Sequence, residues 1–172
     1  MSQKRESDRR VLPVESKNGL LTVWNSRWAD LLDAAKENSI GRARICAHQS
    51  PDSKIQEMLI AFMRDSYVRP HRHLNKSESF HVHAGDLSVI FFDEEGRETE
   101  RVPLSADNPE KAFFFRSERN DWHTVLVESK YALVHEITSG PYDDVAKDFA
   151  PWAPEEGDQI AIEQFLQTLK RD

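Results

Sequence analysis

Apolar and polar residues alternate along much of the middle of the chain, and this pattern predicts short β-strands separated by turns. The strands are expected at 42–50, 56–63, 80–92, 101–104, 112–116, 122–128 and 131–137, with a short helix as the alternative for 56–63. The run 80–92 would be two strands around a tight turn at 84–86, and the last two segments would form a hairpin about 128–130. Short strands with regularly spaced turns predict an all-β sandwich or barrel.

Apolar side chains recur at the spacing of an α-helix near each end of the chain. They are Trp28, Leu31, Leu32 and Ala35, and then Ile162, Phe165, Leu166 and Leu169. Asn25 or Ser26 would cap the first helix, and Asp158 would cap the second. Residues 1 to about 10 are almost wholly polar, and we expect them to be disordered.

The stretch 69–85, which reads RPHRHLNKSESFHVHAG, carries the candidate chemistry. Pro70 favours an extended backbone, so His71 and His73 would leave the same face of a strand and could bind one atom. After four loop-like residues, Glu78 begins a second alternating run. Two imidazoles and a carboxylate are ligands that a divalent transition metal prefers.

The spacing of this stretch (His-x-His, four residues, Glu, six residues, Gly) resembles the first motif of the cupin superfamily. The resemblance implies a cupin-type double-stranded β-helix, or jelly-roll barrel, flanked by the two predicted helices. It also implies one divalent metal ion per chain, held by His71, His73, Glu78 and a later histidine, which here would be His123. The second cupin motif is degraded, because Glu118 and Asn120 stand where cupins often carry Pro and Gly. Zn, Fe, Mn, Ni or Co would accept this ligand set.

A second resemblance covers most of the chain. The sequence is similar to the WbuC family of cupin-fold metalloproteins, which is found with bacterial O-antigen and surface-polysaccharide genes. The segments that carry the similarity are RARICAH, SYVRPHRHLNKSESFHV, DWHTV, GPYD and FAPWAPEEG. This resemblance implies a fold and a metal, and it does not imply a reaction.

Side chains near the motif suggest how a small-molecule ligand would bind. Arginine binds anions well, and the candidates for an anion clamp are Arg64, Arg69, Arg72, Arg101, Arg116 and Arg119. Strand alternation favours Arg69, because it would share a face with His71 and His73. Tyr67 could lie at the mouth of the cavity and donate a hydrogen bond there. The barrel interior would be filled by Phe80, Phe91, Phe92, Phe113, Phe114 and Phe115.

Three other histidines are not expected to bind this metal. His81 and His83 lie at odd offsets from Glu78, so they would face away from it, at the outer surface or a subunit interface. His135 could face the cavity, but it more simply fills a strand. Apolar helix faces and outer-face histidines together favour a homodimer.

The chain has 172 residues, which suits one domain: an N-terminal arm and helix at 1–50, the barrel at 51–140, and a C-terminal arm and helix at 141–172. Its net charge of −7 argues against a nucleic-acid partner. The sequence contains no apolar run of about 18 residues, so we expect no membrane-spanning helix. It also shows no signal-peptide pattern. The single cysteine, Cys46, cannot form an internal disulfide, so we expect a cytoplasmic protein.

Three functions fit these features, and no second acid or base stands out that would decide whether the protein is an enzyme. The first is a metal-binding protein that acts on or binds a small polar or anionic metabolite, such as a sugar or sugar nucleotide of surface-polysaccharide (O-antigen) biosynthesis. The second is a non-catalytic sensor or binding module that uses the same pocket. The third is a mononuclear iron-dependent dioxygenase, which needs a redox metal with an open site for oxygen.

Overall fold

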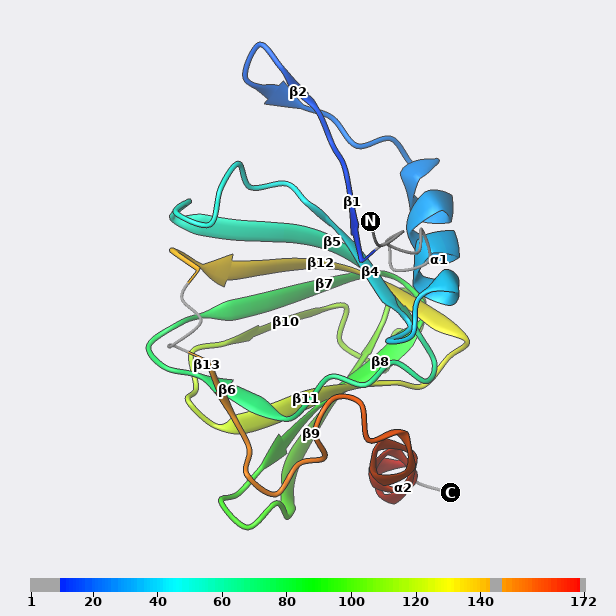
Figure 1. The fold of residues 1–172 in the computed structure, drawn as a ribbon, viewed down its shortest axis with the longest axis vertical. Coiled ribbons are helices and arrows are strands. Elements are labelled where there is room, and N and C mark those ends of the chain that lie inside the picture. Colours follow the sequence, from blue (N-terminus) through cyan, green and yellow to red (C-terminus); the bar gives the residue numbers. More distant parts are fainter. Residues whose placement is uncertain (1–9, 143–146, 171–172) are drawn as a thin grey trace, which may run out of the picture.

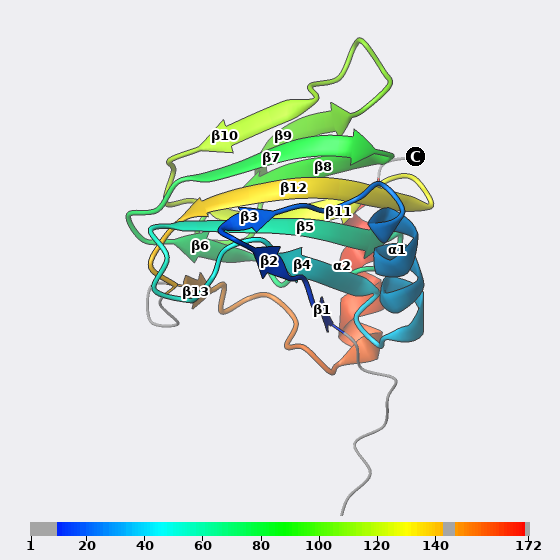
Figure 2. The same cartoon turned by 90° about the horizontal axis from the view of Figure 1, so that it is seen from above.

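The computed structural model describes residues 10–142 and 147–170 (Figures 1 and 2). The expected disorder of residues 1–10 falls almost wholly outside this part of the chain. The helices and strands are β1 (Val11–Leu12), β2 (Ser16–Lys17), β3 (Leu20–Leu21), α1 (Arg27–Glu37), β4 (Arg42–Cys46), β5 (Ile55–Met63), β6 (His71–His73), β7 (Glu78–Ala84), β8 (Asp86–Phe92), β9 (Glu98–Ser105), β10 (Phe114–Ser117), β11 (Trp122–Val127), β12 (Tyr131–Ser139), β13 (Lys147–Phe149) and α2 (Gln159–Leu169).

Most of the strands belong to two sheets that face each other (Figure 1). One sheet has six strands in the order β1-β4-β5-β12-β7-β10, and the other has five in the order β13-β6-β11-β8-β9. Strands β2 and β3 form a small separate hairpin. The predicted all-β jelly roll with a helix near each end is therefore confirmed, as two packed sheets rather than one continuously hydrogen-bonded cylinder.

Two tight connections carry the chain from one sheet to the other. Strands β7 and β8 flank Gly85 but lie in different sheets, and β11 and β12 are divided in the same way. The predicted hairpin about 128–130 is therefore wrong, although both of its strands exist. Gly85 has a φ of 78°, and a Cβ atom at this position would collide with the carbonyl oxygen of Tyr131. The corner between β7 and β8 thus depends on glycine.

Apolar side chains from both sheets fill the space between them. Phe80, Phe91 and Phe115 belong to this interior cluster, together with several valines and leucines. Phe92 instead packs on the other face of its sheet, beneath α2. Phe113 and Phe114 are 61% and 49% exposed, so the expectation that they fill the interior is wrong. Phe114 lies opposite His81 in the register of β10 with β7, so it shares the outer face of the sheet with that residue, and Phe113, just before β10, lies 5.6 Å from the ring of His81.

Each helix covers the outer face of one sheet. Leu31 and Ala35 of α1 pack on β4 and β5 of the six-stranded sheet, and Leu166 of α2 packs with Ile90 beneath the five-stranded sheet. Asp158 caps α2 as predicted, since its Oδ1 accepts a hydrogen bond of 3.0 Å from the backbone N–H of Ala161. The apolar helix faces are covered by the chain itself, so they do not by themselves require a second subunit.

Candidate metal centre

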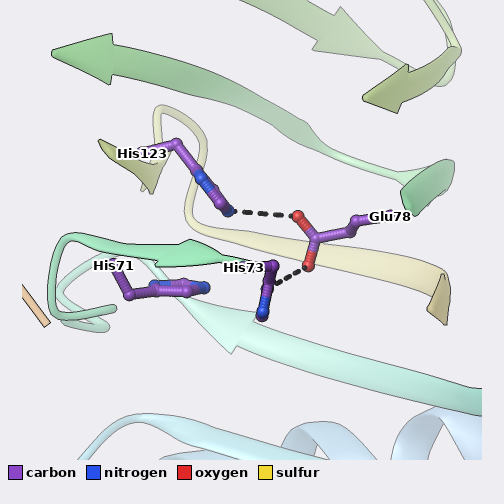
Figure 3. Close-up of side chains that lie close together, drawn as sticks. All are labelled: His71, His73, Glu78 and His123. Carbon is purple, nitrogen blue, oxygen red and sulfur yellow. Dashed lines mark ion pairs between the residues drawn. The ribbon is translucent and has the colours of Figure 1, made fainter. Parts of the chain in front are cut away.

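Four side chains from three strands converge between the two sheets (Figure 3). His71 and His73 come from β6, Glu78 begins β7, and His123 belongs to β11. Each offers a ligand atom, and these atoms all lie within 4.8 Å of one another. This is the set of residues that the sequence motif singles out, and the fold brings all four into one cluster able to hold a metal ion.

Strand β6 is held in place on both sides. His71 pairs with His123 of β11, and the backbone of β13 pairs along the other edge. Pro70, just before the strand, is fully buried, and its carbonyl accepts a hydrogen bond of 2.9 Å from the N–H of Ala150. Asn75 then turns the chain towards β7 with a φ of 57°, a conformation that Asn tolerates well. The extended geometry inferred from Pro70 is thus realised.

Backbone carbonyls fix two of the imidazole rings. The Nδ1 atom of His71 lies 2.9 Å from the carbonyl oxygen of Arg69, and that of His123 lies 3.0 Å from the carbonyl oxygen of Asp121. A carbonyl oxygen only accepts, so each Nδ1 carries the proton and donates it. The Nε2 atoms are then the ones with a lone pair for a metal, and this hydrogen bonding is typical of metal-ligating histidines.

Glu78 lies between two of these histidines. Its Oε2 is 3.3 Å from Nε2 of His123, and its Oε1 is 3.6 Å from Nε2 of His73 (Figure 3). Burial raises the pKa of the Glu78 carboxyl, but His123 and His73 lower it by more, so this pKa lies well below its ordinary value. The buried side chain is therefore a carboxylate, whose charge is compensated by protons on the neighbouring imidazoles or, in their place, by a bound cation.

The donor set fits a metal ion. An unprotonated Nε2 and a carboxylate oxygen repel each other at this distance unless a proton or a metal ion lies near both. Nε2 of His73 is buried and has no hydrogen-bond partner among the described residues. Buried polar atoms without a partner are uncommon and mark positions that a ligand can satisfy. A transition metal ion would satisfy all of these atoms together.

A small pocket opens beside the cluster, with free space of about one water molecule. Its lining consists of His73, Lys76, Glu78, Phe91, Phe115, Ser117, Arg119 and His123. His71 is not part of this lining, so the pocket gives access from the side of His73 and His123. A ligand much larger than water would have to extend outwards past the polar residues at the rim.

Lys76 and Arg119 differ in how far they are already neutralised. The guanidinium of Arg119 is bound by the carboxylates of Glu100 and Asp121 and lies 4.5 Å from the ring centroid of Phe91. Nζ of Lys76 donates to the carbonyl oxygen of Pro141 at 3.0 Å, and no carboxylate pairs with it within the described chain. Arg119 is thus the rim cation whose charge carboxylates already neutralise.

The two residues proposed from sequence to bind a substrate lie elsewhere. The guanidinium of Arg69 packs on the ring of Phe149, with its Cζ 5.1 Å from the ring centroid, and it is not part of the pocket lining. Arg69 contributes to the cluster through its carbonyl oxygen instead. Tyr67 is buried on the outer side of the five-stranded sheet, where its hydroxyl donates to the carbonyl oxygen of Pro154 at 2.7 Å.

Lys76 and Ser117 are pocket residues that the sequence reasoning did not single out. Lys76 belongs to the loop between the His-x-His pair and Glu78. Its positive charge, so close in sequence to three candidate ligands, is the feature that could have identified it as a pocket residue. Ser117 ends β10, which pairs with β7, so it lies opposite Glu78 in the register. Only the pairing of these two strands reveals its place.

The two-sheet jelly roll, with three histidines and a glutamate between the sheets, defines a protein with a cupin fold. Among solved structures, the chain is similar to L-ribose isomerase of Cellulomonas parahominis, with a TM-score of 0.52, 16% identity, and coverage of 67% of this chain and 72% of that chain. It is also similar to protein SO0799 of Shewanella oneidensis, with a TM-score of 0.51, 14% identity, and coverage of 60% and 70%. At these identities the similarity concerns the fold alone.

A family model described as a domain of unknown function, DUF6016, matches residues 23–104. The matched segment includes His71, His73 and Glu78, whereas His123 lies beyond it. A comparison with curated proteins found no match. The helices in the described ranges are all too short or too polar to cross a membrane.

Proposed function

We propose that this protein is a cupin-fold metalloprotein that binds or acts on a small polar or anionic metabolite. The observation that carries the proposal is the buried cluster of His71, His73, Glu78 and His123, in which the Nε2 atom of His73 is left without a hydrogen bond. One divalent metal ion per chain would be held by these four residues. When bound, such an ion acts as a Lewis acid on a hydroxyl or carbonyl group.

The residues around the pocket favour a ligand with an anionic group. A divalent cation with one carboxylate and three neutral imidazoles leaves a net positive centre, and Lys76 adds positive charge at the rim, where Arg119 is already paired with Glu100 and Asp121. Phe91 and Phe115 form an apolar wall. A sugar phosphate or sugar nucleotide has both the anionic group and the hydroxyls that this site could hold, and the similarity to the WbuC family favours a role in surface-polysaccharide assembly.

Elemental analysis and a thermal-shift screen test the proposal together. The purified protein should contain metal, and His73→Ala combined with Glu78→Ala should remove the metal from this centre. The metal-loaded protein should then be stabilised by sugar phosphates, sugar nucleotides or small carboxylates, because a ligand that binds only the folded state raises the melting temperature. A double variant that keeps the same metal at this centre would contradict the ligand assignment.

A matched pair of lysine variants tests the anion preference. Lys76→Ala should lose the stabilisation by anionic ligands, whereas Lys54→Ala, at an exposed position outside the pocket lining, should keep it. Stabilisation confined to neutral apolar compounds would overturn the proposed ligand class. Binding without turnover of any ligand in the screen would favour a non-catalytic sensor.

A further inference from the structure

A second group of histidines lies on the outer face of the six-stranded sheet, apart from the candidate metal centre. His81 and His83 are alternate residues of β7, so their side chains leave the same face. His135 of β12 lies directly opposite His81 in the antiparallel register. His81 and His83 are exposed, and the side chain of His135 is 25% exposed.

The spacing of the three rings approaches that of the buried cluster. The ring centroids of His81 and His83 are 4.8 Å apart, and those of His83 and His135 are 6.4 Å apart. The histidine rings of the candidate metal centre are separated by 4.5 to 5.5 Å. The separation of His83 and His135 is wider than any in the buried cluster, so binding one ion with all three rings requires a change of rotamer at the exposed His81 and His83.

Aromatic side chains flank two of the three outer rings. Trp28 of α1 lies 5.4 Å from the ring of His83, and Phe113 lies 5.6 Å from that of His81. Burial lowers the pKa of His83, and the nearby His81 and His135 lower it further. A neutral imidazole is the form that binds a metal ion.

A carboxylate orients the third ring. Nε2 of His135 lies 2.8 Å from Oε1 of Glu57, a residue of β5 on the same face of the sheet. This contact places a proton on Nε2 and leaves Nδ1 with the lone pair. A carboxylate that holds the far nitrogen of a ligating histidine is a common supporting feature of metal sites.

We propose that His81, His83 and His135 form a second metal site, which binds a divalent transition metal ion from solvent, with Glu57 positioning His135. Three imidazoles suit Zn, Cu and Ni, and exclude Mg and Ca, which prefer oxygen ligands. The site is exposed, so water would complete the coordination. It shares no residue with the candidate metal centre and does not depend on that centre being occupied.

Equilibrium dialysis against micromolar Zn²⁺, followed by elemental analysis, tests the second site. The wild-type protein should bind one more zinc ion per chain than His83→Asn at the same free zinc concentration. Glu57→Gln should weaken this binding by about tenfold, as for other supporting carboxylates. Both variants change exposed or half-exposed polar residues, and circular dichroism verifies their fold.

Trp28 gives an independent readout, because it lies next to His83. Cu²⁺ bound at the second site should quench the fluorescence of Trp28. The quenching that comes from Trp28 should be absent from both Trp28→Phe and His83→Asn. His48→Asn serves as the control, since it removes a histidine whose ring is not one of the three proposed ligands. Nδ1 of His48 lies 3.0 Å from the backbone N–H of Glu57, and the Oδ1 atom of asparagine can accept the same hydrogen bond, so Glu57 stays in place.

Two results would overturn the second site. One is an equal zinc content of the wild-type protein and His83→Asn, and the other is an equal loss of zinc in His48→Asn. The wild-type protein and these variants all have the same buried centre. The difference in their zinc content therefore tests the second site even if the buried centre holds no metal.

Discussion

His71 and His123 lie directly opposite each other in the antiparallel pairing of β6 with β11, and their ring centroids are 4.5 Å apart. The backbone of the five-stranded sheet therefore fixes the relative position of two candidate ligands before any metal binds. A pre-organised site loses little conformational freedom when the metal binds, so a smaller entropy cost opposes the binding free energy.

Zinc should accordingly stabilise the folded protein. At a free concentration of 100 times its dissociation constant, an ion that binds only the folded state adds about 2.7 kcal/mol to the free energy of unfolding. Thermal unfolding with zinc and with a chelator measures this difference, and the His83→Asn background removes the outer histidine group from the comparison. Glu78→Gln should lose most of the response, and Mg²⁺ should produce little. An undiminished zinc response in Glu78→Gln would show that Glu78 is not a ligand.

Gly85→Ala should destabilise the protein much more than Gly19→Ala. Both glycines have similar positive φ angles, of 78° and 76°, so alanine is strained in both by about 1 kcal/mol. A Cβ at Gly85 also meets the carbonyl oxygen of Tyr131, whereas no atom lies within 4 Å at Gly19. The additional cost at Gly85 should be about 2 kcal/mol or more. Urea denaturation of both variants gives the comparison, and equal costs would exclude a role for the collision.

Tyr67→Phe should change how stability depends on alkaline pH. Burial raises the pKa of Tyr67 well above the ordinary value of about 10. The folded state therefore keeps the phenol neutral where the unfolded state ionises it, so stability is retained below about pH 10 and falls above it. Tyr67→Phe should weaken this fall and cost about 1 kcal/mol at pH 7 through the lost hydrogen bond to Pro154.

Urea denaturation at neutral pH and above pH 10 measures both effects of Tyr67→Phe. Tyr142→Phe is the control, since Tyr142 is 56% exposed. An alkaline loss of stability in Tyr67→Phe as steep as in the wild-type protein would assign that loss to other groups.

Asp158→Ala should destabilise the protein by about 1 kcal/mol, the usual cost of losing a helix N-cap. Its Oδ1 accepts from the N–H of Ala161 in the first turn of α2, and alanine leaves that donor without its partner. Chemical denaturation should show the loss, and Asp158→Asn should restore most of the stability. Glu155→Ala, at an exposed position just before the helix, should have little effect.

Local patterns predicted both helices and most of the longer strands, but they missed the short strands β1, β2, β3 and β13 and did not show which strands pair. Alternation placed strands on both sides of residues 128–130, and the turn chemistry between them suits either a hairpin or a corner between sheets. Which one forms depends on the long-range pairing of β11 with β8 and of β12 with β5 and β7. Nothing within 122–137 specifies those partners.

The ligand motif was more predictable than the pocket around it. His71, His73 and Glu78 are close in sequence, and their spacing fixes their faces once the strands are known. Arg69 shares the alternation of His71 and His73, yet its side chain packs on Phe149 of β13. That strand comes from the C-terminal arm, which shows no regular pattern in the sequence. The contact between Arg69 and Phe149, which keeps the Arg69 side chain out of the pocket, could therefore not be predicted.

The four candidate ligands are divided between the two sheets: Glu78 belongs to the six-stranded sheet, and the three histidines belong to the five-stranded sheet. An ion bound to all four would join the two layers across the interior. Amide hydrogens of β7 and β11 would then exchange with solvent mainly through global unfolding. Helix α2 lies on the outer face and provides no ligand, so its amide hydrogens could still exchange through local unfolding of the helix. Metal binding should therefore slow hydrogen exchange more in the sheets than in α2.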